Sequence, residues 1–147
     1  AQQLRDLAFA CIMGKATHSK SNWAATRAAA KEWTRWEMAT SRLIPDVEYL
    51  EKAEDLDFAV AFARIECHYF INEIFVEEAH ILNNVNKIQN IPTFIVQGRY
   101  DVVCPTRSAW DLHKAMPSSI LKIIADSGHS MGEVGIAKQL VAFTDNV

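Results

Sequence analysis

The chain has 147 residues with a formal net charge of −3, and half of its residues are apolar, so it can form a packed core. No cluster of lysine or arginine indicates a nucleic acid or a membrane as a partner. The three cysteines are far apart and odd in number, which argues against a disulfide framework and for a reducing, cytoplasmic compartment. No apolar run approaches the roughly 18 residues of a membrane span, and no signal peptide is visible.

The chain lacks an initiator methionine, and its first residues begin in the middle of a helical pattern. We therefore expect it to be a piece of a longer protein. The first predicted helix is Gln2–Met13, which has apolar residues at helical spacing. A second, alanine-rich helix is predicted from Asn22 to about Thr40, with Ser21 as its N-cap.

More helical segments follow. A turn or short helix is predicted after Pro45, and a longer helix begins at Asp55 or Asp57. A last helical segment is predicted over about Val76–Ile88. Residues 1–90 are therefore expected to be mostly helical.

The hydrophobic period changes after Ile91. The β-branched runs Thr93–Gln97 and Ile120–Ile124 predict two strands. Thr106–Ala115 and about Val134–Thr144 predict helices. The order strand, helix, strand, helix implies two parallel strands joined by a right-handed crossover. Because parallel sheets are normally covered on both faces and contain more strands, these two need neighbours that the sequence does not contain.

Two residues suited to proton transfer follow the predicted strands. Asp101 lies after the first strand and His129 after the second. Active residues of open α/β sheets lie at the carboxyl ends of strands, so these two side chains should meet there. A carboxylate bonded to imidazole fixes its tautomer and stabilises the imidazolium formed during proton transfer. Alone, Asp101 is explained as a turn residue and His129 as a partly buried polar group, but the pair favours a catalytic acid and base.

Residues Gly128–Gly132 match the G-x-S-x-G pattern of a nucleophile elbow. In α/β-hydrolases the serine precedes the acid and the histidine along the chain, yet no histidine follows Ser130. Asp126 and Ser127 also separate the pattern from its strand, whereas an elbow turns directly off its strand. We therefore interpret Ser130 as a loop hydroxyl and His129 as the base.

Four segments, in order along the chain, resemble the proline iminopeptidases (prolyl aminopeptidases) of the α/β-hydrolase fold. They are WTRWEMATSRLIPD, FAVAFARIECHYFIN, IPTFIVQGRYDVVCPTRSAWDLHKAMP and DSGHSMGEVGI. The resemblance covers about residues 20–147 well and the first helix weakly. It implies an α/β fold that is the C-terminal part of an α/β-hydrolase, with a helical cap at residues 1–90 and two parallel strand–helix units at residues 91–147. It also implies that Asp101 and His129 are the acid and base of the catalytic triad.

Two acidic residues of the predicted cap, Glu37 and Glu66, lie among apolar and aromatic residues. The ordinary interpretation of any single glutamate is a solvated or salt-bridged surface residue. An exopeptidase, however, must bind the charged amine of its substrate, and carboxylates in a low-dielectric cap do so. The resemblance implies that Glu37 and Glu66 recognise the amine of a peptide with a free N-terminal proline.

Other candidate residues are interpreted as structural. The aromatic residues at helical spacing are expected mainly to pack between helices, although a few could line a pocket: Trp33, Trp36, Phe62, Tyr69 and Phe70. The histidines His68, His80 and His113 have no metal-ligand spacing, and Cys104 has no apparent activating partner. We expect no metal or organic cofactor.

The chain departs from the family in one important respect. No nucleophile elbow precedes Asp101, and no glycine-rich segment supplies an oxyanion hole. We therefore expect this chain alone to be inactive, with the missing N-terminal part of the same protein as its partner. Two alternatives stay open. The chain could be a fragment of another capped α/β-hydrolase, of the esterase or epoxide hydrolase type, or a non-enzymatic helical module whose strands pair with another chain.

Overall fold

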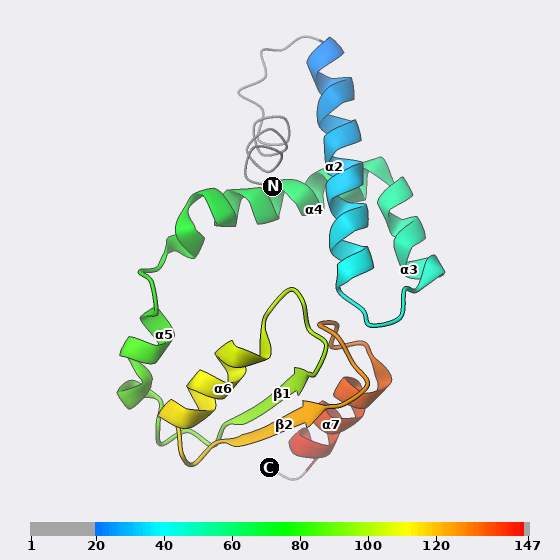
Figure 1. The fold of residues 1–147 in the computed structure, drawn as a ribbon. Coiled ribbons are helices and arrows are strands. Elements are labelled where there is room, and N and C mark those ends of the chain that lie inside the picture. Colours follow the sequence, from blue (N-terminus) through cyan, green and yellow to red (C-terminus); the bar gives the residue numbers. More distant parts are fainter. Residues whose placement is uncertain (1–19, 146–147) are drawn as a thin grey trace. The chain divides into compact units, whose positions relative to one another are not determined.

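A computed structural model describes residues 20–145 of the chain (Figure 1). The helix predicted at Gln2–Met13 lies outside the described residues. Within the described part the chain forms two compact units. The first unit is helical, and the second contains both strands.

The first unit consists of the described residues up to Ala39 together with Asp46–Glu77. Its elements are α2 (Lys20–Thr40), α3 (Val47–Glu51), α4 (Leu56–Ile71) and the 3-10 turns η1 (Lys52–Glu54) and η2 (Glu73–Phe75). Asp46 and Asp55 are the N-caps of α3 and α4, and their carboxylates accept hydrogen bonds from backbone N–H groups in the first turn. These caps fix where both helices begin.

Small side chains bring α2 and α4 together. Ala30 of α2 and Ala63 of α4 are fully buried in the core of this unit. Alanine has no side chain beyond Cβ, so the two backbones approach closely enough for the hydroxyl of Thr34 to donate to the carbonyl of Ala59 at 3.3 Å. Trp33 packs against the same core, which places its indole beside α4.

The second unit consists of residues 40–45 and the described residues from Glu78 onward. Its elements are α5 (His80–Asn83), η3 (Val85–Lys87), β1 (Phe94–Gly98), α6 (Thr106–Ala115), β2 (Ile120–Ile124) and α7 (Val134–Thr144). The two strands form a parallel sheet whose register pairs Gly98 with Ile124. The carboxyl ends of both strands therefore lie level at one edge of the sheet.

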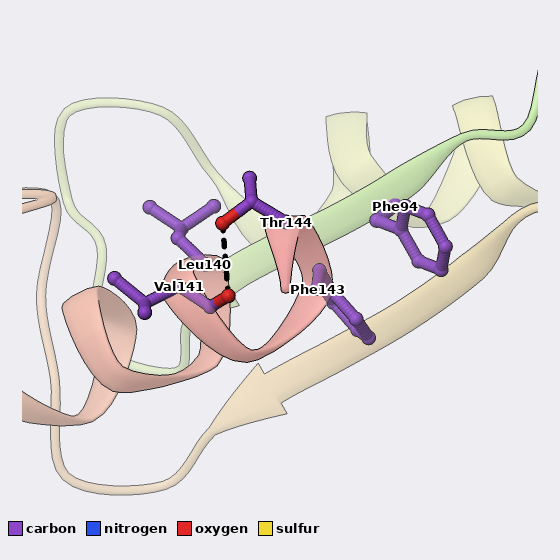
Figure 2. Close-up of a pocket in the computed structure, with 5 residues that line it drawn as sticks. All are labelled: Phe94, Leu140, Val141, Phe143 and Thr144. Carbon is purple, nitrogen blue, oxygen red and sulfur yellow. Dashed lines mark hydrogen bonds between the residues drawn. The ribbon is translucent and has the colours of Figure 1, made fainter. Parts of the chain in front are cut away.

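Helices α6 and α7 cover opposite faces of the sheet, and Figure 2 shows α7 in front of the strands with α6 behind them. On the α7 face, the ring of Phe94 stacks on that of Phe143 with centroids 4.4 Å apart. An open, mostly apolar cavity of about 340 Å³ lies at this contact and is lined by Phe94, Leu140, Val141, Phe143 and Thr144 (Figure 2).

The observed elements match most of the predicted ones. Helix α6 and strand β2 have the predicted bounds, and β1 is displaced by one residue from the predicted Thr93–Gln97. Two predictions are wrong. Ser21 lies inside α2 rather than at its N-cap, because Lys20 is already helical. The helix predicted over Val76–Ile88 is only the short α5 and η3, because Ala79 has a left-handed φ of 57° that an α-helix cannot continue.

The fold is a mixture of helices and a parallel sheet, compatible with part of an α/β fold. Ile120 and Ile123 of β2 are 44% and 46% exposed, so α6 and α7 leave part of this strand uncovered. The division into a cap at residues 1–90 and strand–helix units at residues 91–147 stays a prediction. Within the described residues, every helix is too short or too polar to span a membrane.

Gly98 ends β1 where the strand passes the loop that follows β2. A Cβ atom at Gly98 would lie 1.8 Å from the carbonyl oxygen of Gly128, far inside van der Waals contact. We expect Gly98→Ala to destabilise the second unit by about 1–3 kcal/mol or more, because strand and loop must separate. Urea unfolding followed by circular dichroism measures this loss.

The matched control is Gly132→Ala. Its added Cβ would meet its nearest atoms at 3.4 and 3.5 Å, which is ordinary contact. Equal free energies of unfolding for the two variants would contradict the steric explanation.

Candidate active site

Asp101 and His129 meet at the carboxyl edge of the sheet. Asp101 lies in the loop after β1, and His129 lies in the loop after β2. Nδ1 of His129 is 3.0 Å from Oδ2 of Asp101. Since an ionised carboxylate only accepts hydrogen bonds, Nδ1 carries the proton and Nε2 is the acceptor nitrogen of the neutral ring.

The two side chains differ in their access to solvent. The side chain of Asp101 is 5% exposed, whereas that of His129 is 39% exposed. No residue of the described part forms a hydrogen bond with Nε2 of His129. A buried carboxylate therefore orients an imidazole whose outer nitrogen is open to a reacting group.

The carboxylate of Asp101 is fully hydrogen-bonded. Oδ1 accepts from the backbone N–H groups of Val103 at 2.9 Å and Cys104 at 2.7 Å. Oδ2 accepts from Nε2 of Gln97 at 3.0 Å in addition to His129. Burial by itself raises the pKa of Asp101, but the hydrogen bond from Cys104, the hydrogen bond and charge of His129 and the hydrogen bond from Gln97 together outweigh burial, and the pKa lies below its ordinary value. Asp101 is therefore a carboxylate at neutral pH.

Backbone contacts fix the loop that carries His129. The N–H groups of His129 and Ser130 both donate to the carbonyl of Ser41, at 3.0 and 2.7 Å. The N–H of Gly128 donates to the carboxylate of Glu133 at 2.9 Å. Hydrogen bonds therefore hold the backbone of three consecutive residues, Gly128, His129 and Ser130, and this fixes the position from which the imidazole projects.

Parallel pairing continues beyond the ends of the two strands. The N–H of Arg99 donates to the carbonyl of Ile124 at 2.9 Å, and that of Tyr100 to the carbonyl of Ser127 at 3.0 Å. These bonds hold the two loops side by side. The absence of a side chain at Gly98 permits the contact, because its Cα faces the carbonyl of Gly128.

The G-x-S-x-G match does not form a nucleophile elbow. Ser130 lies within a loop rather than between a strand and a helix, and its hydroxyl accepts a hydrogen bond from the N–H of Gly132 at 3.2 Å. The φ angle of Ser130 is not positive, so its backbone lacks the strain of an elbow. The structure agrees with the interpretation of Ser130 as a loop hydroxyl.

Glu66 lies on α4 in the first unit, where it is half-buried. Its carboxylate accepts a hydrogen bond from the indole Nε1 of Trp33 at 2.7 Å. Burial raises the pKa of Glu66, and the bond from Trp33 offsets only part of that rise. A poorly solvated carboxylate of this kind gains strongly from a neighbouring cation.

The thiol beside Glu66 is unreactive. Burial, together with the charge of Glu66, raises the pKa of Cys67 to about 12, so the thiol stays protonated at neutral pH. Cys67 is fully buried in the core of the first unit.

Glu37 is partly buried on α2, one turn after Trp33 and therefore on the same side of that helix. The rings of Trp33 and Trp36, on the same helix, pack with centroids 5.6 Å apart. Glu37 and Glu66 thus belong to the first unit, whereas Asp101 and His129 belong to the second.

Two contacts were not anticipated from the sequence. Gln97 was not singled out, although it is the one polar side chain in a strand of sequence FIVQG that leads directly to Asp101. That isolated polar position is a signal that could have identified it. Trp33 was interpreted as packing, and its indole N–H also bonds to Glu66. A side-chain donor of this kind is not visible in a hydrophobic pattern.

A second serine–histidine contact has a structural explanation. Nδ1 of His113 is 2.8 Å from Oγ of Ser119, and that hydroxyl donates to the carbonyl of Met116 at 2.7 Å. The proton of Ser119 is therefore held by a carbonyl, and His113 does not act as its base. In the part of the chain that the structure describes, no group of three or more His, Cys, Asp or Glu side chains could hold a metal ion.

No family model matches the sequence. Individual curated proteins do match. The proline iminopeptidase of Arabidopsis thaliana is 55% identical over 121 residues, which are 82% of this chain and 32% of that protein. The proline iminopeptidase of Xanthomonas citri is 54% identical over 123 residues, 82% of this chain and 39% of that protein. That of Xylella fastidiosa (strain Temecula1) is 52% identical over 124 residues, 83% of this chain and 40% of that protein.

These matches show that the chain is similar in sequence to part of a group of peptidases. Within that class the resemblance to the proline iminopeptidases is confirmed, and the chain is related to a segment of that family's sequence. It spans only about a third to two-fifths of the length of the relatives that it matches.

Asp101→Asn should destabilise the second unit at neutral pH and reduce its sensitivity to acid. The folded-state pKa of Asp101 is lowered, so the carboxylate contributes fully to stability above its ordinary pKa and loses that contribution as the pH falls through the folded-state value. At pH 7 we expect a loss of about 1–3 kcal/mol, because an amide cannot accept all the bonds of a buried carboxylate. Urea midpoints measured from neutral to acidic pH test this.

The control for this series is Asp126→Asn, since Asp126 is an exposed carboxylate in the loop after β2. It should follow the wild-type dependence on pH. If Asp101→Asn also followed the wild-type curve, the buried carboxylate would not contribute to stability as described.

Proposed function

We propose that this chain is the C-terminal part of a proline iminopeptidase, a serine exopeptidase of the α/β-hydrolase fold, and that it supplies the acid and base of the triad. The observation that carries the proposal is the 3.0 Å contact between Asp101 and His129, with Nε2 of His129 open. In this proposal residues 1–90 form the cap and residues 91–147 the last strand–helix units. The complete enzyme acts in the cytoplasm and releases N-terminal proline from peptides.

In the proposed reaction, Nε2 of His129 takes the proton of a serine hydroxyl as that oxygen attacks the scissile carbonyl. The imidazolium then gives the proton to the leaving amine, which breaks the peptide bond and leaves a prolyl ester on the serine. Water, deprotonated by the same nitrogen, hydrolyses the ester and frees proline. Asp101 stays ionised throughout and stabilises the imidazolium, which its hydrogen-bonded environment favours.

The nucleophilic serine and the oxyanion donors are assigned to the remainder of the protein. The relatives extend well beyond the matched segment, and within the described residues Ser130 does not have the geometry of a nucleophile. This chain by itself is accordingly proposed to be inactive. The chemistry needs no metal or organic cofactor, because imidazole activates the serine.

We assign Glu66 and Glu37 to recognition of the substrate amine. The burial that raises the pKa of Glu66 makes pairing with a cation favourable, and Trp33 holds one of its oxygens at 2.7 Å. Glu37 is partly buried on the same side of α2 as Trp33. A blocked N-terminus carries no charge to satisfy these carboxylates, so the site would select free amines.

His129→Ala should abolish peptidase activity in the full-length protein, lowering kcat/KM by roughly 10⁴-fold or more, because it removes the general base. Ser130→Ala should keep most of the activity, since its hydroxyl only accepts a bond from Gly132. Hydrolysis of a proline amide measures both variants. The reverse result, an inactive Ser130→Ala and an active His129→Ala, would identify Ser130 as the nucleophile.

Glu66→Gln and Glu37→Gln should raise KM for a free-amine proline amide by about tenfold or more, because each removes a charge-assisted bond to the amine. The exposed Glu48 of the first unit supplies the control, Glu48→Gln, for which KM should not change. An unchanged KM in both site variants would favour another capped hydrolase, of the esterase or epoxide hydrolase type.

A further inference from the structure

Gln97 is a half-buried amide at the end of β1. Its Nε2 lies 3.0 Å from Oδ2 of Asp101 and 3.1 Å from the carbonyl oxygen of Cys104, with a longer contact of 3.3 Å to the carbonyl of Gly98. An amide nitrogen carries two hydrogens, so the two shorter contacts use both of them. One side chain thus bonds to the carboxylate and to the far end of the loop that surrounds it.

We propose that Gln97 is a positioning residue for the acid of the site: its amide holds Oδ2 of Asp101 toward His129 and closes the loop from Gly98 to Cys104 around the carboxylate. This inference rests on the proposed function, because it concerns proton transfer at His129. Gln97 acts through Asp101 and does not itself touch the reacting atoms.

The sharing of Oδ2 gives the amide a definite effect. Oδ1 is held by two backbone N–H groups, and Oδ2 is shared between Gln97 and His129. The hydrogen donated by Gln97 reduces the electron density that Oδ2 offers to the imidazole. Without it, Oδ2 would bond more strongly to the imidazolium. The ring would then stay protonated, and unable to accept a proton from the nucleophile, up to a higher pH.

The only charged neighbour that lowers the pKa of Asp101 among the described residues is the base itself, His129. Among the described residues, the titratable side chain in contact with Asp101 is His129, and Val103 and Cys104 contribute only backbone N–H groups. Gln97 is therefore the side chain that tunes the acid independently of the base.

The decisive variant is Gln97→Met in the full-length enzyme, because methionine has a similar length and no donor. We expect kcat for a proline amide to fall by roughly tenfold, the loss typical of one hydrogen bond to a charged group, with KM unchanged. The acidic limb of the kcat profile should move to higher pH. Gln89→Met, at an exposed glutamine before β1, is the matched control and should leave both unchanged.

A titration that does not depend on activity separates this inference from the proposed function. The ¹³C resonance of the Asp101 carboxyl, assigned with Asp101→Asn, should report a higher pKa in Gln97→Met than in the wild type, because one stabilising bond is lost. An unchanged titration would overturn the positioning role even if the enzyme were a peptidase. A raised pKa in a protein without peptidase activity would support the role and contradict the function.

Gln97→Glu serves if the methionine variant does not fold. It keeps the size of the side chain but places a second carboxyl group beside Oδ2, and the repulsion between two carboxylates raises the apparent pKa of the pair above that of Asp101 in the wild type. A fall in melting temperature with an unshifted pH profile and an unshifted Asp101 titration would show that Gln97 only supports the loop, and would overturn the proposal.

Discussion

The close approach of the β1 end to the loop after β2 is the constraint on which the acid–base pair depends. The register that pairs Gly98 with Ile124 sets both strand ends level, and the backbone bonds of Arg99 and Tyr100 carry the pairing into the loops. Only a residue without Cβ fits where Gly98 faces the carbonyl of Gly128. A wider separation at this point would place the carboxylate and the imidazole beyond hydrogen-bonding distance.

The buried carboxylate is tolerable because every acceptor position has a donor. Removing a carboxylate from water without partners costs several kcal/mol, and the group would then be protonated instead. Here, two backbone N–H groups, an amide and an imidazole compensate Asp101, and its pKa lies below rather than above the ordinary value. Glu66 shows the opposite balance, since a single indole N–H does not compensate its burial. Asp101 is thus stable as an anion, whereas Glu66 would be stabilised by a neighbouring cation.

The sequence predicted the parts of this arrangement that follow from periodicity and topology. Strand β2 and helix α6 were predicted with their bounds, and the carboxyl-end rule brought Asp101 and His129 to one edge. The sequence could not predict the contact of Gln97 with the carbonyl of Cys104, because that contact depends on how the loop turns Cys104 back toward the strand. The helix expected over Val76–Ile88 failed for a related reason: a left-handed backbone that no hydrophobic pattern indicates.

The contacts that orient His129 all lie within the second unit. Its imidazole is bonded to Asp101, its own N–H to Ser41, and the preceding glycine N–H to Glu133. Ile120 and Ile123 of β2 are exposed, yet none of these bonds involves that surface. In the proposed enzyme the base is therefore oriented before the nucleophile reaches it. In that proposal the site is completed by a serine hydroxyl within hydrogen-bonding distance of Nε2 and by donors for the oxyanion.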